Sequence, residues 1–280
     1  MVGTWNRWSA GDDFFRSTDG GATWKSLRQF AVFDTSLSPF LNYQVTFGVW
    51  NASIEIDPFD SNHALYDGGN TVWATNDLTN LDSGEPTHWT VGADGIEETV
   101  ILDLVSPPAG AHLLSAVGDE GGFRHDDLNV SPVPFLNPHM VSVPSIDFAE
   151  LNPLVMARVG MLNYSGDLGS AFSMDGGATW VPIGGTPPGA GAGSAVTGTN
   201  ATVAVSADGR TYVWAPADAV PAYIRQAGWI SSMGAPAGLR VVVDRVNPNK
   251  FYGYDPATGT VYVSTDGGAS YAPQATWAAA

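Results

Sequence analysis

Short runs of apolar residues recur along the whole chain, and each is followed by a turn rich in Asp, Asn, Gly or Pro. The runs are only a few residues long and hold many Val, Ile, Phe and Tyr residues, which is typical of β-strands. No segment shows the sustained 3.6-residue periodicity of a helix. The pattern therefore predicts an all-β protein with many hairpins.

The predicted strands come in pairs that repeat along the chain. Each first strand runs into an Asp and a turn, and a second strand follows. Three clear copies begin at residues 53–58, 145–148 and 241–245, and two divergent copies lie at 100–104 and 201–205. Four steps of about 47 residues lead from Asp57 to Asp244, and four-stranded propeller blades repeat every 40–50 residues or so. The period predicts a β-propeller.

A turn motif of the form Ser-x-Asp-x-Gly-x-Thr-Trp, known as the Asp-box, occurs three times. Its copies are Ser17–Trp24, Ser173–Trp180 and, with changes, Ser264–Tyr271; weaker copies lie at 74–89 and 223–229. The Asp can accept hydrogen bonds from backbone N–H groups of the turn, and the Gly supplies a positive φ. We expect the terminal Trp to be buried between adjacent sheets. The motif is interpreted as a staple for a hairpin and not as a catalytic site.

These repeats define the expected domain. Residues 1–280 are predicted to form a single partial β-propeller domain, in which 1–50 supply the end of one blade plus an excursion and 51–277 supply about five blades. Such a propeller has about five to six of seven blades and is incomplete, because too little sequence follows the last Asp-box to finish a blade and return to the first.

Composition narrows the set of partners. The chain has 28 Asp and Glu against 11 Lys and Arg, a formal charge of −17. Binding of nucleic acid or of an anionic membrane needs clustered Lys and Arg, so neither is expected, whereas a neutral polysaccharide is compatible. There is no Cys, no spacing of His and Asp that predicts a metal site, and no indication of a cofactor. Neither a transmembrane run nor a signal peptide is recognisable.

One loop carries candidate chemistry. The apolar run Leu113–Val117 leads into Gly118-Asp119, and two glycines follow Glu120, so the backbone can turn tightly beside a ligand. We expect Glu120, Asp126 and Asp127 to crowd Asp119 with like charge, which raises a carboxyl pKa toward that of a general acid. From the residues alone, Asp119 is either a turn residue or a catalyst. His125 is either a hydrogen-bonded structural residue or a second functional group.

Several longer segments resemble the xyloglucanases of glycoside hydrolase family 74, which are built as two seven-bladed propellers facing each other across a cleft. The Asp-boxes are shared with sialidases and receptor propellers and are unspecific, but the other matches occur in family order. They lie at residues 56–62, 95–99, 106–108, 115–119, 122–128, 147–153 and 244–251. The resemblance identifies the chain as a part of the C-terminal, seven-bladed propeller of such an enzyme.

The resemblance also implies a mechanism. The family hydrolyses xyloglucan with inversion, using one Asp from each propeller. The general acid lies in a Gly-Asp-x-x-Gly-Phe motif, which Gly118–Phe123 matches, so Asp119 is the expected acid. Residues expected to bind the substrate there are Gly118, Gly121, Gly122, Phe123 and His125. The partners implied are xyloglucan or a related β-glucan and a missing N-terminal propeller of the same polypeptide, and the implied location is extracellular.

The family's general base lies in a segment Asp-x-Gly-Gly-Ala-Tyr-Arg-Trp that nothing in this chain matches. Inversion needs two carboxyls about 6.5–9.5 Å apart with a water between them. We therefore expect the isolated chain to contribute only the acid half of the cleft and to be inactive.

Tryptophans outside the intact Asp-boxes are candidates for stacking on sugar faces, with core packing as the alternative. Trp50 is favoured because it precedes the strand Ile56–Asp60, where the family resemblance implies a cleft-facing aromatic; the others are Trp5, Trp8, Trp73 and Trp214. The alternative function is a non-catalytic Asp-box propeller that binds glycan or protein on one face. A sialidase is disfavoured, because that chemistry needs a cluster of Arg.

Overall fold

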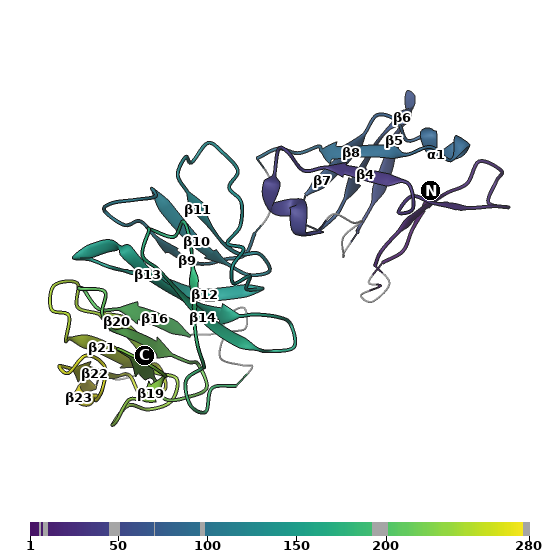
Figure 1. Cartoon of the computed structure of the whole chain (residues 1–280). Coiled ribbons are helices and arrows are strands. Elements are labelled where there is room, and N and C mark those ends of the chain that lie inside the picture. The colour runs from purple at the N-terminus through teal and green to yellow at the C-terminus, as the bar shows by residue number, and fades with distance from the viewer. Residues whose placement is uncertain are drawn as a thin grey trace. The chain divides into compact units, whose positions relative to one another are not determined.

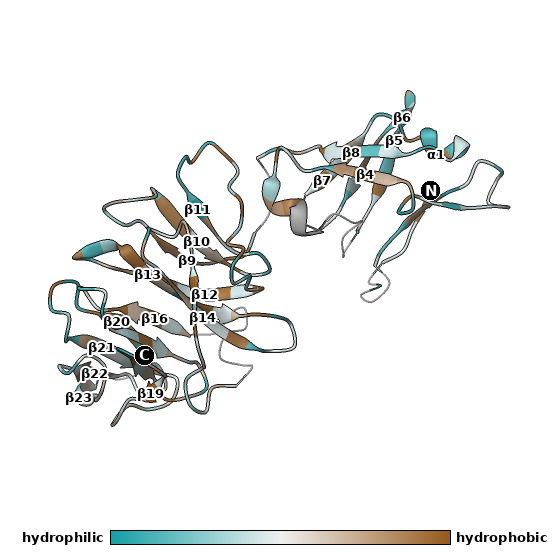
Figure 2. Cartoon of the chain, in the orientation of Figure 1, coloured by the Kyte–Doolittle hydropathy of each residue, from teal (hydrophilic) through white to brown (hydrophobic). Residues whose placement is uncertain are grey.

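The structure, a computed structural model, describes residues 1–5, 7, 11–44, 51–69, 71–95, 99–191 and 201–276. It divides into two compact units, Met1–Thr99 and Val100–Ala280 (Figure 1). Almost all regular structure in the described residues is β-strand; the helical segments are η1 (Pro39–Gln44) and α1 (Asn80–Ser83). Apolar residues are most evident along the strands of the second unit (Figure 2). The all-β prediction is confirmed.

The first unit holds two sheets. One has the order β1-β2-β3 and the other β4-β8-β7-β6-β5. Their bounds are β1 (Val2–Gly3), β2 (Phe14–Arg16), β3 (Lys25–Ser26), β4 (Ala31–Asp34), β5 (Ile54–Asp57), β6 (Asp60–Asp67), β7 (Val72–Thr75) and β8 (Thr87–Val91). Strand β4 pairs in parallel with β8, with Phe33 opposite Trp89, so part of the expected excursion adds a fifth strand to the second sheet.

The second unit holds four consecutive sheets. The first is β9 (Ile101–Val105), β10 (Leu113–Val117) and β11 (Gly121–His125). The next is β12 (Ser142–Ala149), β13 (Asn152–Met161), β14 (Leu168–Ser173) and β15 (Val181–Ile183). Then come β16 (Thr202–Val205), β17 (Tyr212–Ala215), β18 (Ala222–Ile224) and β19 (Ile230–Ser231). The last is β20 (Arg240–Val243), β21 (Phe251–Asp255), β22 (Thr260–Ser264) and β23 (Ala272–Thr276).

The four sheets of the second unit are arranged as propeller blades. Their first strands, β9, β12, β16 and β20, lie beside one another in that order. Three buried apolar clusters fill the spaces between consecutive sheets; Leu114 and Met156 share the first, Val159 and Trp214 the second, and Val213 and Phe251 the third. A sheet that is apolar on both faces must pack between two neighbours, which gives the radial stacking of a propeller. The fold is a β-propeller with Asp-box repeats. That all 280 residues form one domain stays a prediction.

The expectation that too little chain follows the last Asp-box to finish a blade and return is wrong in its first part. Strand β23 (Ala272–Thr276) pairs antiparallel with β22, with Ala272 opposite Val263, and completes a four-stranded sheet. The described residues form six sheets, in agreement with the expected five to six blades.

The Asp-boxes have the predicted local geometry. Asp175 accepts hydrogen bonds from the Ser173 hydroxyl (2.8 Å) and the Thr179 backbone N–H (2.9 Å), and these bonds hold its pKa down at about 2. The same pattern recurs at Asp19 and Asp266. Each of these aspartates staples the connection between the last two strands of its sheet.

The aromatic residue that ends the Asp-box is not always buried. Trp180 is 6% exposed and Tyr271 4%, but Trp24 is 45% exposed, so the expected burial of Trp24 is wrong. In the first unit the weaker copy is also a true box: Asp77 accepts from the Thr75 hydroxyl (2.8 Å) and the His88 N–H (2.8 Å).

Candidate functional site

Asp119 lies in the tight turn that joins β10 to β11. Val117 and Gly121 pair across the turn, and the Glu120 N–H donates to the Gly118 carbonyl at 2.8 Å. Asp119 has a φ of +66° and is the one non-glycine residue with positive φ in the described part of the chain. An i→i+2 bond around a residue with positive φ is a γ-turn of the rare, strained kind. Such strain is found most often at functional sites, and here it presents an exposed carboxylate at a strand end.

Three glycines shape this turn. A Cβ on Gly121 (φ +76°) would lie 2.4 Å from the Met140 carbonyl oxygen, and one on Gly122 (φ +143°) would lie 2.3 Å from the Ser115 carbonyl oxygen. Both glycines are buried, as is Gly118, which forms an isolated β-bridge with Ser142. Their role in the structure is therefore to let the backbone of the turn pack against its neighbours. Their contact with substrate stays a prediction.

The carboxyl crowding at the turn differs from the expectation. Glu120 is 4% exposed, and burial, with a further contribution from the Asp119 charge, raises the pKa of its carboxyl to about 7. Asp126 and Asp127 follow the far end of β11, about 16 Å of strand away, so the prediction that they crowd Asp119 is wrong. Asp126 instead pairs with Arg124 at 2.8 Å.

Phe123 and His125 lie on β11 on one face of the sheet, since alternate residues of a strand share a face. Phe123 is 5% exposed and its ring lies 6.1 Å from the His125 ring. His125 Nε2 lies 3.0 Å from the Ser115 hydroxyl, and burial lowers the pKa of this histidine. These contacts give His125 a structural role; the substrate contacts of both residues stay predictions.

Tyr164 is a residue of the site that the sequence analysis missed. Its hydroxyl donates to Oδ1 of Asp119 at 2.9 Å, and its side chain is 71% exposed. Tyr164 belongs to the loop between β13 and β14, so the contact joins two neighbouring sheets at one rim. Partial burial of the hydroxyl and the adjacent Asp119 charge raise its pKa. Nothing in the sequence links two positions 45 residues apart.

The tryptophans proposed to stack on sugar faces differ in their exposure to solvent. Trp214 is fully buried and Trp73 is 4% exposed, so both are core residues and not stacking platforms. Trp5 is 69% exposed. Trp50, the favoured candidate, and Trp8 lie outside the described residues.

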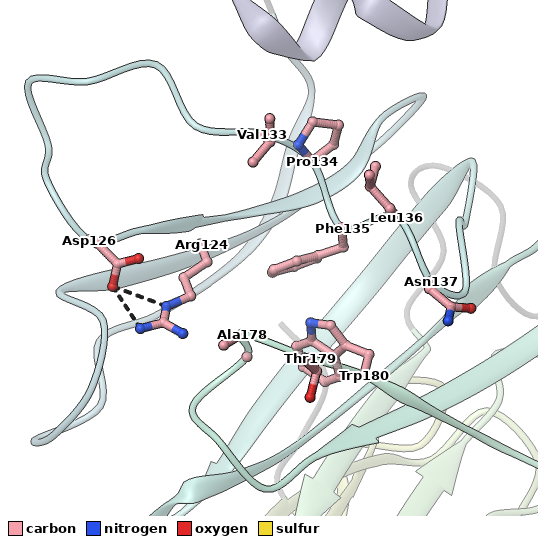
Figure 3. Close-up of a pocket in the computed structure, with 11 residues that line it drawn as sticks. Arg124, Asp126, Val133, Pro134, Phe135, Leu136, Asn137, Ala178, Thr179 and Trp180 are labelled. Carbon is pink, nitrogen blue, oxygen red and sulfur yellow. Dashed lines mark hydrogen bonds and ion pairs between the residues drawn. The ribbon is translucent and has the colours of Figure 1, made fainter.

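A hollow of about 500 Å³ lies at the opposite end of β11 from Asp119. It is bounded by the ion pair of Arg124 with Asp126 and by the rings of Phe135 and Trp180, whose centroids are 5.2 Å apart (Figure 3). Both rings are buried, at 5% and 6% exposed, and present little face to a ligand. This hollow belongs to the Asp-box end of the blade and is separate from the Asp119 turn.

The described residues offer neither a metal-binding cluster nor a membrane-spanning helix. There, no group of three His, Cys, Asp or Glu side chains is placed to hold a metal ion. Within the same residues, no helix has the length and apolar character needed to cross a bilayer.

Comparison with known proteins places these features in a family. Residues 15–26 match the model of the BNR/Asp-box repeat. A xyloglucanase of Paenibacillus is 42% identical over 98% of this chain and 28% of its own length. The xyloglucanase Xgh74A of Acetivibrio thermocellus is 39% identical over 97% of this chain and 34% of its own length. The chain thus spans about a third of the length of the curated relatives it matches.

A solved structure gives the same result. The crystal structure of a GH74 xyloglucanase from Xanthomonas campestris is similar with a TM-score of 0.85 and 36% identity, over 97% of this chain and 38% of that one.

Proposed function

Because the chain belongs to glycoside hydrolase family 74, we propose that it supplies the general-acid half of a cleft that hydrolyses xyloglucan or a related β-glucan. In this proposal Asp119 donates a proton to the glycosidic oxygen as the bond from that oxygen to the anomeric carbon breaks. A water attacks the same carbon from the opposite face, with inversion, and gives its proton to a second carboxylate. That base lies in an N-terminal propeller of the same polypeptide, facing the Asp119 turn.

The observation that carries the proposal is the Asp119 turn. An exposed carboxylate in the turn at the end of a hairpin, within the motif Gly118–Phe123, is placed to reach a bound polysaccharide as a proton donor. Buried Glu120, whose carboxyl pKa is raised to about 7, follows Asp119 in the same turn. A polysaccharide substrate also fits an extracellular location, which is part of the proposal.

The test uses the longer polypeptide in which this chain is joined to the propeller that carries the base. Asp119→Asn keeps the shape of the side chain but cannot donate the proton, so xyloglucan hydrolysis is expected to fall by a factor of about 10² to 10⁴. Asp126→Asn is the matched control, because Asp126 lies at the other end of β11 in an exposed ion pair. It is expected to keep full activity.

Two results would contradict the proposal. One is an Asp119→Asn variant that hydrolyses xyloglucan at the parent rate. The other is turnover of xyloglucan by the isolated 280-residue chain, since the proposed base is not part of it.

A further inference from the structure

The carboxylate of Asp119 accepts a hydrogen bond from the phenol of Tyr164, which a neighbouring loop carries. Tyr164 is carried by the loop of residues 162–167, in which the Asn163 side chain accepts from the Ser165 N–H (3.0 Å) and donates to Asp167 Oδ2 (2.8 Å). The Leu162 N–H also donates to the Asp167 carbonyl at 2.7 Å. These bonds close the loop on itself and hold the backbone that carries Tyr164, whose hydroxyl reaches Asp119.

The direction of the hydrogen bond decides what Tyr164 does. A phenol with a raised pKa stays protonated, so its hydroxyl donates and an oxygen of Asp119 accepts. The accepting oxygen is Oδ1. Since Oδ1 is engaged as an acceptor, the proton of a protonated Asp119 resides on Oδ2.

We propose that Tyr164 is a positioning residue for the general acid: its hydroxyl holds Oδ1 of Asp119 and leaves Oδ2 to deliver the proton to the glycosidic oxygen. The inference rests on the proposed role of Asp119 as the acid. When Oδ2 loses its proton, Asp119 becomes a carboxylate and the bond from Tyr164 becomes charge-assisted, which makes it shorter and stronger. Tyr164 therefore stabilises the charge that develops on Asp119 as the glycosidic bond breaks.

Other groups around the pair are few among the described residues. Glu120 lies in the same turn, and the Asp119 charge acts on it. On the Tyr164 loop the charged group is Asp167, which is already bonded to Asn163. A change in pH dependence can therefore come from Glu120 or from Asp119 with Tyr164, and the experiment must separate them.

The test is Tyr164→Phe in the longer polypeptide with both propellers. Phenylalanine keeps the ring, so any stacking on sugar and the fold are preserved, and only the hydroxyl is lost. We expect kcat on xyloglucan to fall about 10-fold, with KM nearly unchanged, because the bond strengthens in the transition state. The alkaline limb of the kcat pH profile is expected to move up by about one pH unit, because the carboxylate form has lost a donor.

Three further measurements sharpen the test. The shift of the alkaline limb is expected to persist in the Glu120→Gln background, which removes the other titrating carboxyl of the turn. Asn163→Ala retains the hydroxyl but loosens its loop, and an intermediate loss of kcat is expected. Tyr252→Phe is the matched control: its hydroxyl donates to Asp244 at 3.1 Å in the last sheet, and its loss is expected to leave kcat unchanged.

The outcomes distinguish the two proposals. If Asp119→Asn is inactive but Tyr164→Phe has the parent kcat and pH profile, or changes only KM, the inference about Tyr164 is overturned and the function stands. If Asp119→Asn is fully active, the proposed function itself is overturned.

Discussion

Replacement of Trp24 or Trp180 by Ala is expected to have very different effects on local stability, although both residues end the identical sequence Asp-Gly-Gly-Ala-Thr-Trp. Trp180 is 6% exposed and packs into the apolar cluster between the first two sheets of the second unit. Its ring lies 5.2 Å from that of Phe135, and the guanidinium of Arg158 lies 4.8 Å from its centroid. Trp24, by contrast, is 45% exposed.

The magnitudes follow from these contacts. A buried Trp→Ala substitution costs about 3–5 kcal/mol, and loss of a cation–π contact adds roughly 1 kcal/mol. Arg158 is fully buried, so the substitution also leaves its guanidinium in contact with one aromatic ring, that of Phe135, instead of two. We expect Trp180→Ala to cost about 4 kcal/mol, and Trp24→Ala only about 1 kcal/mol because little apolar area is buried there.

Amide hydrogen exchange followed by mass spectrometry measures both effects in the same chain, since it reports local stability for each unit separately. A loss of 4 kcal/mol corresponds to exchange about 1000-fold faster in peptides from β12–β15. Peptides from β2 and β3 are expected to change about fivefold in Trp24→Ala. Equal acceleration by the two substitutions, or none by Trp180→Ala, would refute the packing argument.

Two further predictions concern the Asp119 turn. Gly122→Ala is expected to lower the free energy of unfolding in urea by more than about 3 kcal/mol, because the new Cβ would lie 2.3 Å from the Ser115 carbonyl oxygen. Gly84→Ala is the control: Gly84 has a positive φ but no atom within 4 Å of the new Cβ, so a loss of only about 1–2 kcal/mol is expected. Burial raises the pKa of Glu120 to about 7, so the folded state binds its proton more tightly than the unfolded state does. The stability this provides is complete below the unfolded-state pKa and is lost as pH rises from about 4 to about 7. The free energy of unfolding of Glu120→Gln, relative to that of the parent, is expected to rise by up to about 3 kcal/mol as pH increases toward 7. A difference between the two proteins that does not vary with pH would contradict the pKa assignment.

The sequence predicts those features that depend on contacts between residues close together in the chain. The Asp-box bonds at Asp19 and Asp175 lie within four residues of the aspartate, and the structure has them as the motif predicts. The regular period likewise predicted the sheets, because each apolar strand must be covered by the next blade. The exposure of Trp24 could not be read from its own motif, since burial depends on which neighbouring sheet faces the ring.

The candidate site was predictable only in part, for the same reason. The sequence predicts the position of Asp119 at a strand end, because its motif is local and its turn needs glycines; its catalytic role stays a prediction. The predicted crowding by Asp126 is wrong because a strand separates residues that are near in sequence by about 3.3 Å per residue. Tyr164 and the parallel pairing of β4 with β8 depend on contacts between segments far apart in sequence. No single-sequence pattern encodes such contacts.

The most direct test of the central claim is how the Asp119→Asn defect depends on the leaving group. An aryl glycoside of a xyloglucan oligosaccharide has a leaving group that departs without protonation, so removal of the acid is of little consequence for it, whereas xyloglucan needs the proton. In the longer polypeptide with both propellers, Asp119→Asn is expected to lose xyloglucan hydrolysis by about 10² to 10⁴-fold while its rate on the aryl substrate stays close to that of the parent. Equal losses on the two substrates, or none on xyloglucan, would contradict the assignment of Asp119 as the general acid.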